Sequence, residues 1–120
     1  DPASVTRVLL CSGRLYYDLV KEREHRTDTS TAIIRLEQLY PLPEAEVAEV
    51  LAQYPNASVT WVQDEPRNQG AWPHLALNLF PSLGRTVRVV SRPESATTAA
   101  GRASLHKEQA ATLIAQAFEG

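Results

Sequence analysis

The sequence predicts an α/β fold: a three-layer, open, mainly parallel sheet of four to five strands with helices on both faces. Short β-branched and aliphatic runs alternate with segments whose apolar residues recur at i, i+3, i+4 and i+7, the spacing of a helix packed on a sheet. Strands separated by helices need crossover connections, which make the strands parallel. The 120 residues, 43% hydrophobic, fit one domain, expected over residues 5–120. Residues 1–4 are typical of a linker, so we expect a piece of a longer protein.

The first strand and helix are predicted on either side of a short turn. Val5–Cys11 is a nearly continuous apolar run, which suits a strand covered on both faces. Ser12 and Gly13 then turn the chain into a helix. The apolar stripe of this helix consists of Leu15, Tyr16, Leu19 and Val20.

A second strand and helix follow. Thr31–Leu36 has strand composition, and Pro41 and Pro43 end the extended segment. Glu46 falls in the first turn of the next helix, where a carboxylate is favourable. The stripe of this second helix consists of Val47, Val50, Leu51 and Tyr54.

The stretch from Trp61 to Trp72 joins the third strand to the third helix. Ser58–Val62 has strand composition, and Pro66 must stop the strand because proline lacks an N–H. Gly70 gives the backbone freedom just before the helix. The polar loop lies at the carboxyl end of a strand, the edge where open α/β sheets bind ligands. The third helix carries the stripe Trp72, Leu75, Ala76 and Leu79.

The last strand and helix are separated by a segment of small residues. Thr86–Ser91 is predicted as the fourth strand. Residues 92–102 lack an apolar stripe and are interpreted as an ordered loop that crosses the sheet edge; a fifth strand there stays open. Ser104 is the expected N-cap of the last helix. Its stripe consists of Ala110, Leu113, Ile114 and Ala117.

Composition excludes several classes of function. Twelve basic and fourteen acidic residues leave a formal charge of -2, which argues against nucleic-acid binding and against a basic membrane-binding face. Cys11 is the single cysteine, so no internal disulfide can form. No apolar run approaches the roughly 20 residues of a membrane span. We expect a soluble intracellular protein.

Residues that could carry chemistry are few. The three histidines are scattered without a second ligand at metal-binding spacing, so no metal site is predicted. Asp64 and Glu65 could form a general acid/base pair, but adjacent loop carboxylates are more often solvated or paired with Arg67. Ser12 to Arg14 would place amides and a guanidinium at a helix amino end, where an anion could bind. No catalytic residue is predicted.

Four blocks of the sequence resemble a known family. The chain resembles the carboxy-terminal domain of the decarboxylating, thiamine-diphosphate-dependent component of 2-oxoglutarate dehydrogenase. The family usually has lysine at position 14, glutamate at position 64 and Ala-Pro at positions 97–98, and the residues here preserve charge or bulk. His106 and Glu108 fit its final helix. The blocks are Leu10–Leu19, Ile34–Pro41, Trp61–Trp72 and Arg92–Ala96.

This resemblance implies a transketolase-like carboxy-terminal domain with one antiparallel edge strand in a mixed five-stranded sheet. It implies a homodimeric bacterial cytoplasmic enzyme that oxidatively decarboxylates 2-oxoglutarate in the tricarboxylic acid cycle and passes the succinyl group to a dihydrolipoyl succinyltransferase component. Thiamine diphosphate and magnesium would bind the preceding domains and not this chain. A free-standing α/β interaction or nucleotide-binding module is the alternative.

The resemblance also implies allosteric regulation, because some relatives bind acetyl-CoA or AMP at this domain and its neighbour. Arg67 is expected to pair with Asp64 or Glu65, which leaves Arg14 and Arg92 for a phosphate. Loop or interface anchors are expected at Glu65, Arg67 and Trp72. The candidate effector residues are Arg14, Tyr17, Asn68, Gln69 and Arg92, each at the carboxyl edge of a strand.

Overall fold

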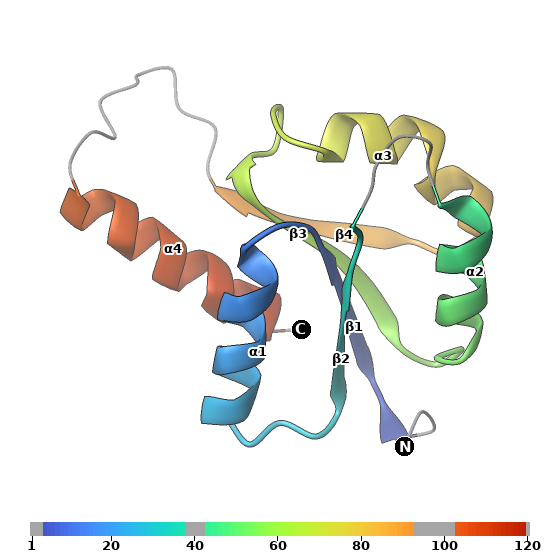
Figure 1. Cartoon of the computed structure of the whole chain (residues 1–120), viewed down its shortest axis with the longest axis horizontal. Helices are drawn as coiled ribbons and strands as arrows, with labels where there is room; N and C mark the ends of the chain where they lie inside the picture. The colour runs from blue at the N-terminus through green and yellow to red at the C-terminus, as the bar shows by residue number, and fades with distance from the viewer. Residues whose placement is uncertain (1–3, 38–42, 93–102, 120) are drawn as a thin grey trace.

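The computed structural model describes residues 4–37, 43–92 and 103–119, and of residues 103–107 only the helical backbone. This part of the chain contains a four-stranded sheet in the order β2-β1-β3-β4, with every neighbouring pair parallel (Figure 1). The predicted α/β fold is therefore confirmed. The elements in chain order are β1 (Arg7–Cys11), α1 (Leu15–His25), β2 (Thr31–Arg35), α2 (Glu44–Ala52), β3 (Ser58–Pro66), α3 (Trp72–Asn78), the 3-10 helix η2 (Phe80–Leu83), β4 (Val87–Arg92) and α4 (Ala103–Ala117).

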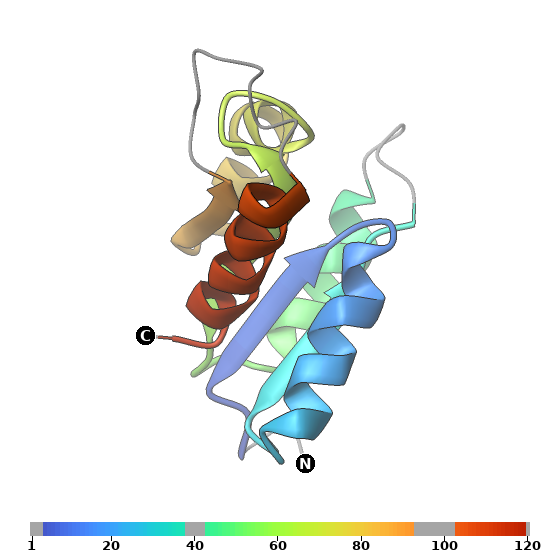
Figure 2. The same ribbon diagram turned by 90° about the vertical axis from the view of Figure 1, so that its left-hand side faces the viewer.

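Helices cover both faces of the sheet and enclose two separate cores. Helices α2 and α3 pack on one face, and α1 and α4 pack on the other, the face turned to the viewer in Figure 2. Side chains along a strand alternate between the faces, so Leu10 and Trp61 enter the first core while Leu9 and Val62 enter the second. The near-continuous apolar strands of the sequence follow from this double coverage.

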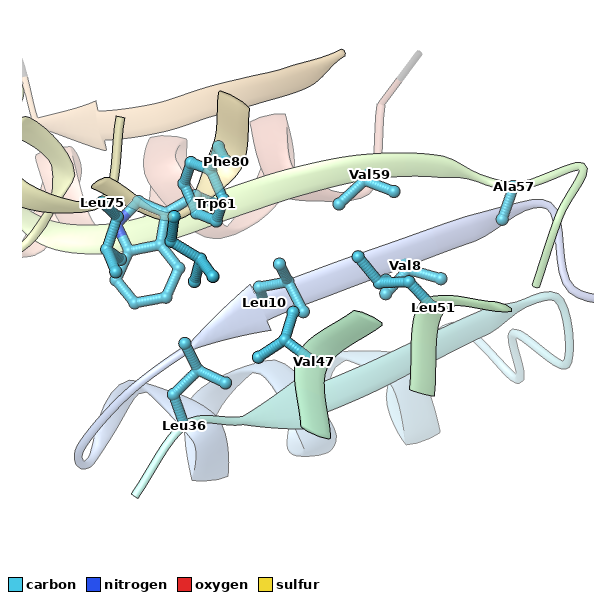
Figure 3. Close-up of a cluster of buried hydrophobic side chains, with 11 residues drawn as sticks. Val8, Leu10, Leu36, Val47, Leu51, Ala57, Val59, Trp61, Leu75 and Phe80 are labelled. Carbon is cyan, nitrogen blue, oxygen red and sulfur yellow. The ribbon is translucent and has the colours of Figure 1, made fainter. Parts of the chain in front are cut away.

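Aromatic side chains fill the first core near the carboxyl ends of the strands. Trp61 is 1% exposed, and its ring centroid lies 6.2 Å from that of Phe80 (Figure 3). Trp72, at the start of α3, is half-buried with its centroid 5.7 Å from Phe80. Trp61 is thus a core residue, whereas Trp72 keeps part of its surface outside the fold.

Arg85 stabilises the turn between α2 and β3, although it lies about thirty residues further along the chain. Its Nη1 donates to the carbonyl of Leu51 at 2.9 Å, and its Nη2 donates to the carbonyls of Tyr54 and Ala57 at 2.8 and 2.6 Å. A helix leaves its last carbonyls without intrahelical partners, and a cation satisfies them well.

Several element boundaries differ from the sequence-based expectation. Strand β3 continues to Pro66, because the sheet goes on after an irregularity that follows the Val62–Val90 pair and places Pro66 opposite Arg92. Helix α4 begins at Ala103, so Ser104 lies within its first turn and is not its N-cap. The loop predicted for 92–102, where a fifth strand was left open, falls outside the described residues apart from Arg92.

The connections from β1 and β3 leave the sheet in opposite directions. The chain passes from β1 to α1 on one face and from β3 to α3 on the other, and β1 and β3 are neighbours in the sheet. Such a topological switch point opens a crevice outside the carboxyl ends of the two strands, where α/β proteins bind ligands. The loops that follow β1 and β3 are therefore the first place to look for a site.

Candidate functional site

The carboxyl edge of the sheet gathers the polar residues that the sequence singled out. Parallel strands end on the same side, so the turn after β1, the end of β2, the loop after β3 and the end of β4 all lie along this edge. Arg14 stands at the amino end of α1, and Asn68 and Gln69 stand in the loop after β3; all three are exposed. Arg92 closes β4 and is only 8% exposed.

The centre of the β3–α3 connection is Gln63, which the sequence did not identify as a site residue. It is 3% exposed and lies on the same face of β3 as Trp61. Its Oε1 accepts the indole N–H of Trp61 at 2.9 Å and the backbone N–H of Trp72 at 2.9 Å. The second bond satisfies one of the amino-terminal N–H groups of α3, whose own N-cap residue, Ala71, has no side-chain acceptor.

The other end of the same carboxamide holds the loop. Gln63 Nε2 lies 2.8 Å from the carbonyls of Pro66 and Gln69 and 3.3 Å from that of Glu65. The backbone of Gly70 has φ +65°, and a Cβ placed there would come 2.8 Å from Glu65 Oε1. The positive φ favours glycine, because other residues rarely adopt this conformation, and any larger residue would also have to displace the exposed side chain of Glu65. The loop is therefore compact and closed on itself.

The side chain of Arg92 connects β4 to β3 and to α4. Its Nε and Nη2 lie 3.0 and 2.8 Å from Asp64 Oδ1, and its Nη1 lies 3.4 Å from Gln109 Oε1 on α4. The guanidinium beside Asp64 is thus that of Arg92, whereas the sequence suggested that Arg67 pairs with Asp64 or Glu65. Asp64 neutralises the charge that was expected to be available for a phosphate.

A second cluster joins the end of β2 to the first turn of α1. The guanidinium of Arg35 stands 5.8 Å from the ring centroid of Tyr16 and 5.3 Å from that of Tyr17, within cation–π range. Its Nη1 also donates to the hydroxyl of Tyr17 at 3.3 Å. Tyr17 remains 60% exposed, so this contact fixes its ring at the surface without burying it.

The described side-chain contacts at this edge form two groups, and Arg14 lies outside both. Tyr17 is joined to Arg35, and the connection after β3 is joined to Arg92 through Asp64. No hydrogen bond between described residues links one group to the other. Neither Gln63 nor Arg35 was predicted as a site residue. The feature that could have pointed to Gln63 is a polar residue two positions after a tryptophan in a buried strand, and for Arg35 it is an arginine at the end of an otherwise aliphatic strand.

Other chemistry has little support in the described part of the chain. It contains no group of three or more His, Cys, Asp or Glu side chains that could hold a metal ion. Burial raises the pKa of the Cys11 thiol to about 12, although Arg35 opposes the shift. A thiol with so high a pKa is a poor nucleophile. None of the described helices is long and apolar enough to cross a membrane.

Comparison with known proteins identifies the family. Residues 1–118 match the model of the 2-oxoglutarate dehydrogenase C-terminal family. The chain is 45% identical to the 2-oxoglutarate dehydrogenase E1 component of Cupriavidus necator, over 98% of this chain and 13% of that protein. It is 45% identical to the 2-oxoglutarate dehydrogenase E1/E2 component of Corynebacterium glutamicum, over 99% of this chain and 10% of that protein.

A third relative, the multifunctional 2-oxoglutarate metabolism enzyme of Mycobacterium sp. (strain JLS), is 38% identical over 98% of the chain and 10% of its own length. The chain therefore spans only 10–13% of the length of these curated relatives. The expectation raised by the four sequence blocks is confirmed at the level of the family. The chain belongs to the 2-oxoglutarate dehydrogenase C-terminal family.

Proposed function

We propose that this chain is the non-catalytic carboxy-terminal domain of a bacterial, cytoplasmic 2-oxoglutarate dehydrogenase. The observation that carries the proposal is the match of almost the whole chain to a carboxy-terminal family, while it spans 10–13% of its relatives. Thiamine diphosphate and magnesium, which supply the decarboxylation chemistry, would bind preceding domains of the same polypeptide. This domain would contribute to the organisation of a homodimer that passes succinyl groups to a dihydrolipoyl succinyltransferase component.

The same proposal gives the domain a regulatory site for an adenine nucleotide such as acetyl-CoA or AMP. The topological switch point between β1 and β3 supports this site, and so do the exposed groups around it. Arg14 offers an exposed guanidinium at the amino end of an 11-residue helix, where backbone N–H groups also favour phosphate. Tyr17 offers an exposed ring held by Arg35, and the loop after β3 offers the amides of Asn68 and Gln69.

The two arginines expected to bind a phosphate, Arg14 and Arg92, differ in exposure. Arg92 is bound to Asp64 and shielded from solvent, so Arg14 is now the stronger candidate for a direct phosphate contact. Arg92 is better suited to hold the end of β3 against β4. Losing a charge-assisted hydrogen bond weakens binding by roughly ten- to hundredfold.

The effector site is tested by activation of the full-length enzyme that contains this chain. Arg14→Ala should raise the acetyl-CoA or AMP concentration that gives half-maximal activation by about tenfold. The unactivated rate separates effector binding from damage to the fold, and Lys21→Ala, an exposed cation further along α1, is the matched control. Equal loss of the activated and unactivated rates would assign Arg14 to the fold or the dimer contact. An unchanged activation curve would remove it from the site.

A further inference from the structure

We propose that Gln63 is the positioning residue of the effector site. Its buried carboxamide sets the shape of the connection from Glu65 to Trp72 and so fixes the place of the exposed amides of Asn68 and Gln69. This inference rests on the proposed regulatory function, because it concerns the same loop. It assigns to Gln63 an effect on nucleotide affinity without any contact with the nucleotide.

The hydrogen bonds of Gln63 leave its carboxamide no donor or acceptor for a ligand. A glutamine side chain has two lone pairs on its oxygen and two N–H donors. Both lone pairs are used by Trp61 and Trp72, and the two N–H groups are shared among three backbone carbonyls. With 3% of the residue exposed, Gln63 can act only through the chain that it holds.

The loop depends on this one side chain for its shape. Three carbonyls of the segment 65–69 converge on a single amide nitrogen, and an unpaired carbonyl in such a place would cost free energy. Within the loop the backbone adds the turn-closing bond from Gln69 N to the Pro66 carbonyl, at 2.9 Å. Gly70 then brings the chain back against Glu65.

The carboxamide is itself firmly held. Trp61 Nε1 fixes its oxygen from within the first core, where the tryptophan is 1% exposed. The binding groups at the loop tip are thus connected to the rigid centre of the domain through one hydrogen-bonded side chain. A preformed loop binds more tightly than a flexible one because less conformational freedom is lost on binding.

The test substitutes Gln63→Glu in the full-length enzyme and measures activation by AMP and by acetyl-CoA. A carboxylate keeps the shape of the side chain and the acceptor for Trp61, but it turns two N–H donors into an anion that faces three carbonyls. The activation constant, which is the nucleotide concentration that gives half-maximal activation, should rise by about tenfold. The unactivated rate should change by a smaller factor.

The pH profile distinguishes positioning from general damage. Burial among carbonyls raises the pKa of a glutamate introduced here, and its protonated form regains one donor. The activation constant of Q63E should therefore recover as pH falls from about 8 to about 6, whereas that of the unsubstituted enzyme should not follow this trend.

A second substitution changes the loop without touching the carboxamide. Gly70→Ala strains a backbone with φ +65° and adds a Cβ that displaces the Glu65 side chain, whose own Cβ would lie 3.1 Å away, so it should also raise the activation constant. Gly84→Ala is its matched control, because Gly84 has nearly the same backbone conformation, φ +66° against +65°, with nothing within 4 Å of the added Cβ. Gly84→Ala should leave activation unchanged.

Three outcomes decide the matter. Weakened activation in Q63E and in Gly70→Ala, but not in Gly84→Ala, supports the positioning role. If Q63E and Gly70→Ala keep the activation constant of the unsubstituted enzyme while Arg14→Ala weakens activation, the positioning role is overturned. The proposal of a regulatory site is then unaffected. Absence of saturable activation by either nucleotide in the unsubstituted enzyme overturns both.

Discussion

The indole N–H of Trp61 donates to Oε1 of Gln63 at 2.9 Å, and both side chains are buried on the same face of β3. The two residues are separated by one position, so the pleat of the strand brings their side chains together. A tryptophan that is buried in a core usually needs a partner for its N–H, and here the partner is the residue that also closes the loop. Packing of the core and the shape of the candidate site are therefore coupled through this contact.

The two tryptophans should differ in their contribution to stability. Trp61→Ala removes a fully buried aromatic side chain and should lower the free energy of unfolding by about 3–5 kcal/mol. If Trp72 were a core anchor, Trp72→Ala would cost as much. Because Trp72 is only half-buried, its loss should cost clearly less than that of Trp61. Denaturant titration of both variants measures the difference, and equal costs would show that Trp72 is a core residue.

Arg85 should be important for stability although none of the described acidic residues forms an ion pair with it. Arg85→Met retains much of the aliphatic stem but leaves the carbonyls of Leu51, Tyr54 and Ala57 without this donor. The free energy of unfolding should fall by at least about 1.5–3 kcal/mol. The matched control is Arg88→Met on β4, since the exposed Arg88 side chain donates only one hydrogen bond to the described residues, to the Glu119 carbonyl at 3.5 Å. Comparable losses for the two arginines would contradict this role of Arg85.

Acid should destabilise the domain partly through Asp28. Burial would raise the pKa of this carboxyl, but hydrogen bonds from Thr31 and Ser30, with Arg7 nearby, outweigh burial and hold the pKa below its ordinary value of 3.8. A depressed pKa stabilises the folded state above pH 3.8, and this contribution disappears as pH falls through the lower folded-state value. Asp28→Asn should therefore show less loss of stability between about pH 5 and pH 2 than the unsubstituted chain. If both proteins lost the same free energy of unfolding over this pH range, Asp28 would be excluded as a source of the pH dependence.

Cys11 should resist thiol reagents in the folded protein. The side chain is 0% exposed, and burial raises its pKa to about 12, so very little thiolate exists near neutral pH. Alkylation by iodoacetamide at about pH 8 should be slow in native buffer and rapid in denaturant. Rapid labelling under native conditions would mean that β1 opens readily or that the thiol reaches solvent.

Periodic patterns made most of the fold predictable. The apolar stripes that include Leu15, Val47 and Leu75 predicted the helices, because a helix packed on a sheet buries residues at a fixed spacing. Strand ends were less certain, since the extension of β3 to Pro66 depends on a partner strand that lies about 26 residues further along the chain. The sheet order also followed only from the folded chain.

The candidate site was harder to predict because its partners are distant in sequence. Arg67 was expected to pair with one of its near neighbours, Asp64 or Glu65, but the parallel register of β3 and β4 brings Arg92 to Asp64. Gln63 contacts mainly backbone carbonyls and N–H groups, and these leave no trace in residue identity. A sequence can indicate which polar residues share a loop, but not which of them organises it.

We proposed above that this chain is a non-catalytic domain of a larger thiamine-dependent enzyme. The most direct measurement is release of carbon dioxide from 2-oxoglutarate, with thiamine diphosphate and magnesium, by the 120-residue chain and by the full-length polypeptide that contains it, assayed side by side. We expect turnover by the full-length protein and none by the 120-residue chain. Turnover by the 120-residue chain, or failure of the full-length protein to decarboxylate 2-oxoglutarate, would contradict the claim.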